Sequence, residues 1–220
     1  SRDHKILNLP IFLISFGADF LETWLSNVEY ARQFSVFHAP REKDKNLFVY
    51  VGPRLSLTAA NADHWISVPP GSEYRVALGI LRVILEENLL PTIDSEQKAI
   101  LRAMVKDWPL EAVVAKTGVK NQLLRDLAGK FVESKRPLAL SGGLSYSGPN
   151  ATDTAVAANL LCSLVHDTQE TLDFEHLSTL GEVARAEEIK NLSERMKHGE
   201  VDLLLIYHAN PVFSLPPSWD

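Results

Sequence analysis

The chain has 220 residues, of which 45% are hydrophobic and 23% charged, and this ordinary globular composition argues against a disordered or fibrous protein. Its 22 Lys and Arg against 28 Asp and Glu give a formal net charge of -6, which disfavours nucleic-acid binding because phosphate contacts need a basic excess. A single cysteine, Cys162, excludes an internal disulfide and a CxxC metal site within the chain. We also expect no direct membrane insertion, because no apolar run approaches the roughly 20 residues that cross a bilayer.

The first third of the chain predicts a βαβ unit. Two nearly continuous apolar runs, residues 11 to 16 and 47 to 51, are typical of strands buried on both faces of a parallel sheet. Between them, large apolar residues from Phe20 to Phe34 recur at helical spacing. A short helix over residues 57 to 62 and a third strand over residues 65 to 68 are expected next.

The middle of the chain is predicted to be helical. Ser72 is a good N-cap for an apolar-striped helix, and Glu73 in its first turn favours the positive end of the helix dipole. Proline and glycine then separate three further helices, over residues 95 to 105, 110 to 116 and 120 to 133.

The last third of the chain continues the alternation of strands and helices. It predicts a strand over 137 to 141, a helix over 152 to 165, a helix over 183 to 198 and a strand over 202 to 207. We therefore expect an α/β fold with a mainly parallel sheet covered by helices on both faces.

We also expect a division into two parts. A lobe over residues 1 to 166 precedes a polar linker over 167 to 180. Residues 181 to 220 then form a helix-strand unit that either packs on the same sheet or opens a further lobe. The abrupt start and end of the sequence suggest a piece excised from a longer polypeptide.

The candidate binding residues follow the predicted strands, because ligands of open α/β sheets bind at the carboxyl ends of strands. Small residues gather in four such loops, which are Gly17-Ala18-Asp19, Gly52-Pro53-Arg54, Ser141-Gly142-Gly143 and His208-Ala209-Asn210-Pro211. Glycine there either relieves turn strain or lets a phosphate or ribose approach the backbone. No GxGxxG or GxxxxGK[ST] motif is present, so neither an ordinary NAD site nor a P-loop is supported.

The charged residues of these loops have alternative roles. Arg54 either meets an anionic ligand or forms a salt bridge at the end of the sheet. Asp19 either caps a helix that begins there, which is the favoured interpretation, or accepts hydrogen bonds from a ribose or a base. Neither His198 nor His208 is expected to be part of a local metal site of the HxxxH kind, and Cys162 is expected to be an inert packing residue in an apolar helix.

Two stretches resemble a known family. The segment from Val49 to Glu73 resembles VDPRxTxTAxxADxxxxxxPGTD of the molybdopterin oxidoreductases, the formate dehydrogenase and dimethyl sulfoxide reductase group. Residues 108 to 119 resemble the TPE...TGV segment of that family. Val201 to Pro211 resembles the strand and GxNP turn that opens its next nucleotide-binding unit.

The resemblance implies a Rossmann-like lobe that holds the guanosine diphosphate arm of a molybdopterin guanine dinucleotide in a parent oxidoreductase. The residues that match its cofactor-binding positions are Gly17, Ala18, Asp19, Gly52, Pro53, Arg54, Gly71, Ser72, Gly142, Gly143 and Ser145. In proteins of that family, the molybdenum ligand and the iron-sulfur cluster lie in other regions of the polypeptide. This chain alone is therefore expected to have no catalytic residue, metal, bound cofactor or turnover.

The sequence departs from the family pattern at two places. Gly52 stands where the family usually has Asp, and Gly17 to Trp24 replaces the usual GxNP turn. The second feature resembles the molybdopterin-like subunit of alternative complex III, in which cofactor binding has degenerated.

Two hypotheses follow, a cofactor-cradling lobe of a redox enzyme and a cofactor-free scaffold module of a membrane-associated electron-transfer complex. Either implies as partners the remaining domains of the parent, an iron-sulfur subunit or domain, and a membrane anchor. The substrate, the metal and the compartment are not assigned.

Overall fold

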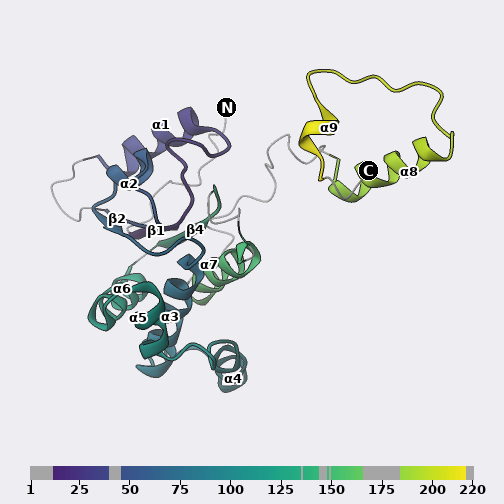
Figure 1. The fold of residues 1–220 in the computed structure, drawn as a ribbon. Coiled ribbons are helices and arrows are strands. Elements are labelled where there is room, and N and C mark those ends of the chain that lie inside the picture. The colour runs from purple at the N-terminus through teal and green to yellow at the C-terminus, as the bar shows by residue number, and fades with distance from the viewer. Residues whose placement is uncertain are drawn as a thin grey trace. The chain divides into compact units, whose positions relative to one another are not determined.

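A computed structural model of the chain describes residues 12–39, 46–134, 136–143, 148, 150–165 and 184–216. The chain divides into two compact units, Ser1–Phe174 and Glu175–Asp220 (Figure 1). The predicted linker over residues 167 to 180 lies outside the described residues.

The first unit contains a parallel sheet and the helices that cover it. Its strands are β1 (Phe12–Phe16), β2 (Leu47–Val51), β3 (His64–Ile66) and β4 (Pro137–Ser141). Its helices are α1 (Asn27–Phe37), α2 (Leu57–Ala60), α3 (Glu73–Glu86), α4 (Ser95–Met104), α5 (Leu110–Thr117), α6 (Asn121–Glu133) and α7 (Ala151–Val165).

The four strands are all parallel and lie in the order β3-β2-β1-β4, which confirms the predicted fold class. Phe12 at the start of β1 pairs with Leu47 of β2 on one side and with Pro137 of β4 on the other. The chain builds outward from β1 through β2 to β3 and then crosses to β4. The strand order therefore reverses between β1 and β4, the position where α/β sheets bind ligands.

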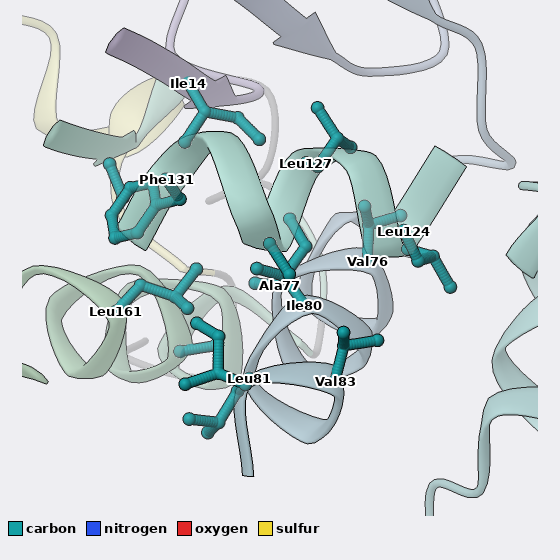
Figure 2. Close-up of a cluster of buried hydrophobic side chains, with 14 of the residues drawn as sticks. Ile14, Val76, Ala77, Ile80, Leu81, Val83, Leu124, Leu127, Phe131 and Leu161 are labelled. Atoms are coloured by element: carbon teal, nitrogen blue, oxygen red, sulfur yellow. The ribbon is translucent and has the colours of Figure 1, made fainter. Parts of the chain in front are cut away.

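Successive residues of the central strands point to opposite faces of the sheet and enter two separate apolar clusters. Ile14 and Val49 pack on the side of α3, α5, α6 and α7, whereas Leu13, Phe48 and Tyr50 pack on the side of α1 and α2 (Figure 1). Figure 2 shows how Ile80 and Leu81 of α3 lie among Leu127 and Phe131 of α6 and Leu161 of α7. The apolar runs of the strands are buried because helices cover both of their faces.

The first helix begins later than its spacing predicts. Residues 20 to 26 form turns, and α1 begins at Asn27 with Ser26 at its N-cap. The backbone carbonyl of Asp19 accepts the N-H groups of Glu22, Thr23 and Trp24 at 3.0 to 3.2 Å. Three N-H groups thus share one carbonyl, and residues 20 to 26 lack the regular hydrogen-bond pattern of the helix that their spacing predicts.

Cys162 of α7 contacts the edge strand β4. The backbone N-H of Ala139 donates to Cys162 Sγ at 3.2 Å, and the thiol donates to the carbonyl of the same residue at 3.4 Å. Burial raises the pKa of this thiol, so the reactive thiolate is disfavoured. These contacts support the prediction of a packing residue.

The second unit contains the helices α8 (Ala186–Lys197) and α9 (Pro211–Ser214). The predicted strand over residues 202 to 207 is wrong, because this segment is irregular and belongs to no sheet in the described part of the chain. A run of apolar residues forms a strand when neighbouring strands accept its backbone hydrogen bonds, and no described residue does so here.

Candidate functional site at the strand ends

The loops that follow β1 and β4 meet at the point where the strand order reverses. A Cβ atom added to Gly143 would lie 2.9 Å from the carbonyl oxygen of Gly17 and 3.3 Å from the backbone nitrogen of Asp19. Gly17 and Gly143 have φ values of 76° and 59°, which glycine adopts without steric cost. The two predicted glycines, Gly17 and Gly143, therefore lie next to each other, and the backbones of their loops are in close contact.

The indole of Trp24 covers the adjacent glycine. A Cβ atom on Gly142 would lie 3.0 Å from Trp24 Nε1, so the tryptophan ring occupies the space above this position. The ring of Trp24 also stacks on Tyr30 of α1, with the ring centroids 5.2 Å apart. A segment that replaces a family turn thus supplies a large side chain directly over the loop after β4.

Arg54 is bound to two carboxylates of the loop after β1. Its Nη2 donates to Asp19 Oδ2 at 3.0 Å and to Glu22 Oε1 at 3.3 Å. Arg54 is half-exposed, whereas the Asp19 side chain is fully buried. Glu22 first, and Asp19 to a lesser extent, raise the pKa of Arg54. Of the two alternative roles for Arg54, this structure contains the salt bridge.

Asp19 does not cap a helix, which corrects the favoured interpretation of this residue. Its Oδ2 pairs with Arg54 and also accepts a long hydrogen bond from the Thr23 hydroxyl at 3.5 Å. Its Oδ1 is buried and has no hydrogen-bond partner among the described residues. An ion pair therefore takes the place of the expected helix cap.

The loop after β2 is closed by aromatic side chains. Gly52 is buried, and its carbonyl accepts a hydrogen bond from Trp65 Nε1 at 3.0 Å. A Cβ atom on Gly52 would lie 2.8 Å from Cε1 of Tyr50, so an Asp at this position would displace the tyrosine ring. Burial raises the pKa of Tyr50 to about 12, although a hydrogen bond with Ser56 lowers it. Pro53, next in the loop, is half-buried.

The N-terminus of α3 is occupied by the carboxylate of its own first residue. Glu73 is 1% exposed, and burial raises its pKa, while the backbone N-H groups of residues 71 to 73 lower it. Oxygen Oε2 of Glu73 is buried and has no described partner. Ser72 is the N-cap residue as predicted, but its side chain makes no capping bond and instead accepts from Arg75 Nη1 at 3.3 Å.

The remaining predicted site residues lie around this arrangement. Ala18 is fully buried, and its carbonyl accepts the Ser15 hydroxyl at 2.9 Å. Gly71 has a φ of 73°, and its carbonyl accepts Asn150 Nδ2 at 3.0 Å. Ser145 lies outside the described residues.

Sequence reasoning missed Glu22 and Trp24 as residues of the site. Both belong to the segment that departs from the family turn, and that departure was the available signal. Within the described ranges, no cluster of three or more His, Cys, Asp or Glu side chains could hold a metal ion. The same residues include no helix that is long and apolar enough to span a membrane.

Comparisons with known proteins agree with the resemblance. No protein-family model matches the chain. The chain is 27% identical, over 93% of its length, to the molybdopterin-binding-like subunit of menaquinone reductase from Nitratidesulfovibrio vulgaris, and it covers 31% of that subunit. It is 25% identical to a nitrate reductase of Klebsiella oxytoca over 63% of its own length and 16% of the reductase.

The fold also matches a solved structure. Acetylene hydratase from Pelobacter acetylenicus aligns with a TM-score of 0.58 and 23% identity, over 72% of this chain and 22% of the hydratase. The chain thus spans less than a third of the proteins it matches. It is therefore a homologue of molybdopterin-binding oxidoreductase subunits and corresponds to a part of such a subunit.

Proposed function

We propose that the chain is a structural Rossmann-like lobe of a molybdopterin-type oxidoreductase subunit, with strand ends that are filled by its own side chains and bind no guanine dinucleotide. The observation that supports this most strongly is the pairing of Arg54 with Asp19 and Glu22. The remaining domains of the parent, an iron-sulfur subunit or domain and a membrane anchor are its proposed partners.

A dinucleotide phosphate would have to compete for Arg54. The guanidinium would give up two carboxylates, and Asp19 would then stay buried without its partner. Leaving a buried carboxylate without a partner is unfavourable, because the charge has been removed from water. Because Arg54 itself is half-exposed and solvent screens its charge, the cost falls on the buried Asp19 carboxylate, which would lose its partner.

A phosphate would also have to compete for the N-terminus of α3. Backbone N-H groups at a helix N-terminus are an anion-binding site. Here burial raises the pKa of Glu73, which is 1% exposed, and the same N-H groups already bind its carboxylate and lower that pKa in part. A second anion beside this carboxylate would be repelled in a poorly solvated site.

Steric contacts oppose a ligand as well. The loops after β1 and β4 touch at Gly17 and Gly143, and the Trp24 indole covers Gly142. The residues present therefore do not fit a nucleotide in this arrangement. The menaquinone reductase relative is a molybdopterin-binding-like subunit, which is compatible with such a lobe.

One observation favours a lobe that does bind guanine dinucleotide. Asp19 Oδ1 and Glu73 Oε2 are buried oxygens without described partners, and the guanine N-H groups are hydrogen-bond donors of the kind they lack. In that case Arg54 would exchange its carboxylates for phosphate.

Calorimetric titration with GDP separates the two candidates. The wild-type chain should give no binding heat up to millimolar GDP, whereas Asp19→Asn with Glu22→Gln frees Arg54 and should yield weak binding. Wild-type binding that is lost in Arg54→Ala but kept in Arg82→Ala, whose partner Glu86 lies 2.7 Å away on α3, would overturn the proposal.

A further inference from the structure

Arg75 of α3 is held between two aromatic rings. Its guanidinium carbon lies 4.9 Å from the centroid of the Tyr74 ring and 5.1 Å from that of the Trp108 ring. The two rings meet edge to face, with their centroids 5.5 Å apart. Tyr74 is buried, whereas Trp108 and Arg75 are partly buried. The rings therefore fix the position of the guanidinium while Arg75 stays partly accessible.

The guanidinium of Arg75 lacks acceptors for its hydrogen bonds. A guanidinium carries several N-H donors and has no acceptor of its own. Here Nη1 donates to Ser72 Oγ at 3.3 Å, and Nε is buried without a partner among the described residues. No ion pair between described residues includes Arg75. Glu73 does not supply one, because its carboxylate accepts the N-H groups of residues 71 to 73.

The other arginines of the first unit show what this one lacks. Arg82, later on α3, donates through Nε to Glu86 at 2.7 Å and through Nη1 to the carbonyl of Val105 at 2.9 Å. Arg54 and Arg125 also pair with carboxylates of the chain. A side chain that only packed between the rings would need no charge, since its apolar stem supplies that contact. The unmatched charge of Arg75 therefore points to an acceptor that the described residues do not supply.

A carboxylate is the acceptor that fits this position. Arginine and carboxylate form paired, charge-assisted hydrogen bonds. A phosphate would bring more negative charge close to the start of α3, where Glu73 is already buried. Arginine, tyrosine and tryptophan are also the residues that contribute most to binding in protein interfaces. The combination of the two rings and the guanidinium thus favours an acidic side chain on a protein surface.

We propose that Arg75 binds the carboxylate of an Asp or Glu side chain presented by another domain of the parent polypeptide, with Tyr74 and Trp108 orienting the guanidinium. This inference rests on the proposed role of the chain as one lobe of a larger subunit. The relative that aligns over 93% of the chain is covered over only 31% of its own length, so most of a homologous parent lies outside these residues. Because the rings already hold the guanidinium, binding does not have to order a flexible side chain.

Cross-linking identifies the carboxylate. Arg75→Lys keeps a positive charge that the two rings accommodate, and a carbodiimide joins a lysine amine to a carboxylate in direct contact with it. In the parent polypeptide, mass spectrometry should find residue 75 of this variant linked to an Asp or Glu outside the 220 residues. Arg32→Lys, at an exposed position of α1, is the matched control and should give no such link. A link confined to the 220-residue chain, a link to a separate subunit, or no link would overturn the proposal.

Stability measurements separate an interface role from simple packing. Arg75→Gln should lower the melting temperature of the parent polypeptide by several degrees more than that of the 220-residue chain, whereas Arg32→Gln should change neither. Equal losses in the two would mean that Arg75 only packs within the lobe. Replacing the cross-linked Asp or Glu by its amide should cause the same loss as Arg75→Gln, and the double variant should lose no more. Additive losses would overturn the proposed pair.

The result can be distinguished from that for nucleotide binding. If GDP binds the wild-type chain and still binds Arg75→Gln while the cross-link forms, the structural-lobe proposal fails and the Arg75 contact stands. GDP binding that is lost in Arg75→Gln would identify a phosphate as the anion and overturn the contact with a carboxylate.

Discussion

The two units of the chain differ in which side chains they bury. The first unit buries the carboxylates of Asp19 and Glu73, which are 0% and 1% exposed. The second exposes Leu203 and Leu205, which belong to the most apolar tetrapeptide of the protein, at 75% and 85%. The first unit thus buries charged groups near its strand ends, whereas the second exposes large apolar side chains.

This difference separates the tendency of a segment to be buried, which a sequence pattern shows, from its actual burial, which the pattern does not show. An apolar run indicates that a segment gains free energy from burial, but whether it is buried depends on partners elsewhere in the chain. The strands β1 and β2 have their helices and neighbours within the first unit. Residues 201 to 207 have α8 and no described strand.

The largest expected effect tests this contrast directly. Ile14→Ala removes a fully buried side chain at the centre of β1 and should lower the free energy of unfolding by about 2–5 kcal/mol. Leu205→Ala, at 85% exposure, should change it by less than about 0.5 kcal/mol. Urea denaturation of the 220-residue chain measures both values. A similar loss in the two variants would show that residues 201 to 207 are packed after all.

Much of the fold could be predicted because its signals are local. The apolar runs of β1, β2 and β4 and the breaks at Pro109 and Gly118 gave element positions that the structure confirms within a few residues. The failures at residues 20 to 26 and 202 to 207 have different causes, since the first reflects a local hydrogen-bond arrangement and the second depends on strand partners that the described chain does not supply. The carbonyl of Asp19 gathers three N-H groups in one case, and strand partners are missing in the other.

Tyr50 allows the buried polar layer to be tested by pH. Its pKa in the folded chain is about 12, above the ordinary 10.0, so the phenol contributes stability that is complete below pH 10 and is lost as pH rises through 12. A difference of 2 pKa units corresponds to roughly 3 kcal/mol. Wild type should therefore lose about 2 kcal/mol of this relative to Tyr50→Phe between pH 10 and 12, because each group is half-ionised at its own pKa. Tyr207→Phe, at a residue 86% exposed, is the control and should run parallel to wild type.

Gly143 tests whether the loops after β1 and β4 are in contact. Gly143→Ala places a methyl group 2.9 Å from the carbonyl oxygen of Gly17 at a φ of 59° and should cost about 2–3 kcal/mol. Gly118→Ala has a similar φ of 74° but no atom within 4 Å, so it should cost about 1 kcal/mol. Thermal unfolding of both variants separates contact from conformation. Equal losses would mean that the crevice between these loops is open, which would favour the nucleotide-binding candidate.

The candidate site could be located from the sequence but not understood from it. Glycines at the ends of parallel strands identified the place, since strand direction fixes which loops converge. Whether Arg54 meets a ligand or a carboxylate depends on Glu22, which lies 32 positions earlier and belongs to no motif. The positions of Trp24 over Gly142 and of Tyr50 beside Gly52 depend on side-chain packing, which spacing does not encode.

The smallest expected effect concerns the charge that is buried at the N-terminus of α3. The pKa of Glu73 is raised above 4.5 because burial outweighs the backbone N-H groups of residues 71 to 73. Folding therefore favours the protonated side chain, and its contribution to stability is complete below pH 4.5 and is lost as pH rises through the folded pKa. Glu73→Gln cannot ionise, so its stability relative to wild type should increase between pH 4 and pH 7 in urea denaturation.

Glu111→Gln, at an exposed position in the first turn of α5, is the control and should show no such increase. A constant difference for Glu73→Gln would mean that the helix N-terminus compensates the charge fully. The ionised carboxylate of Glu73 would then be fully stabilised where it lies, and a phosphate would gain still less free energy by replacing it.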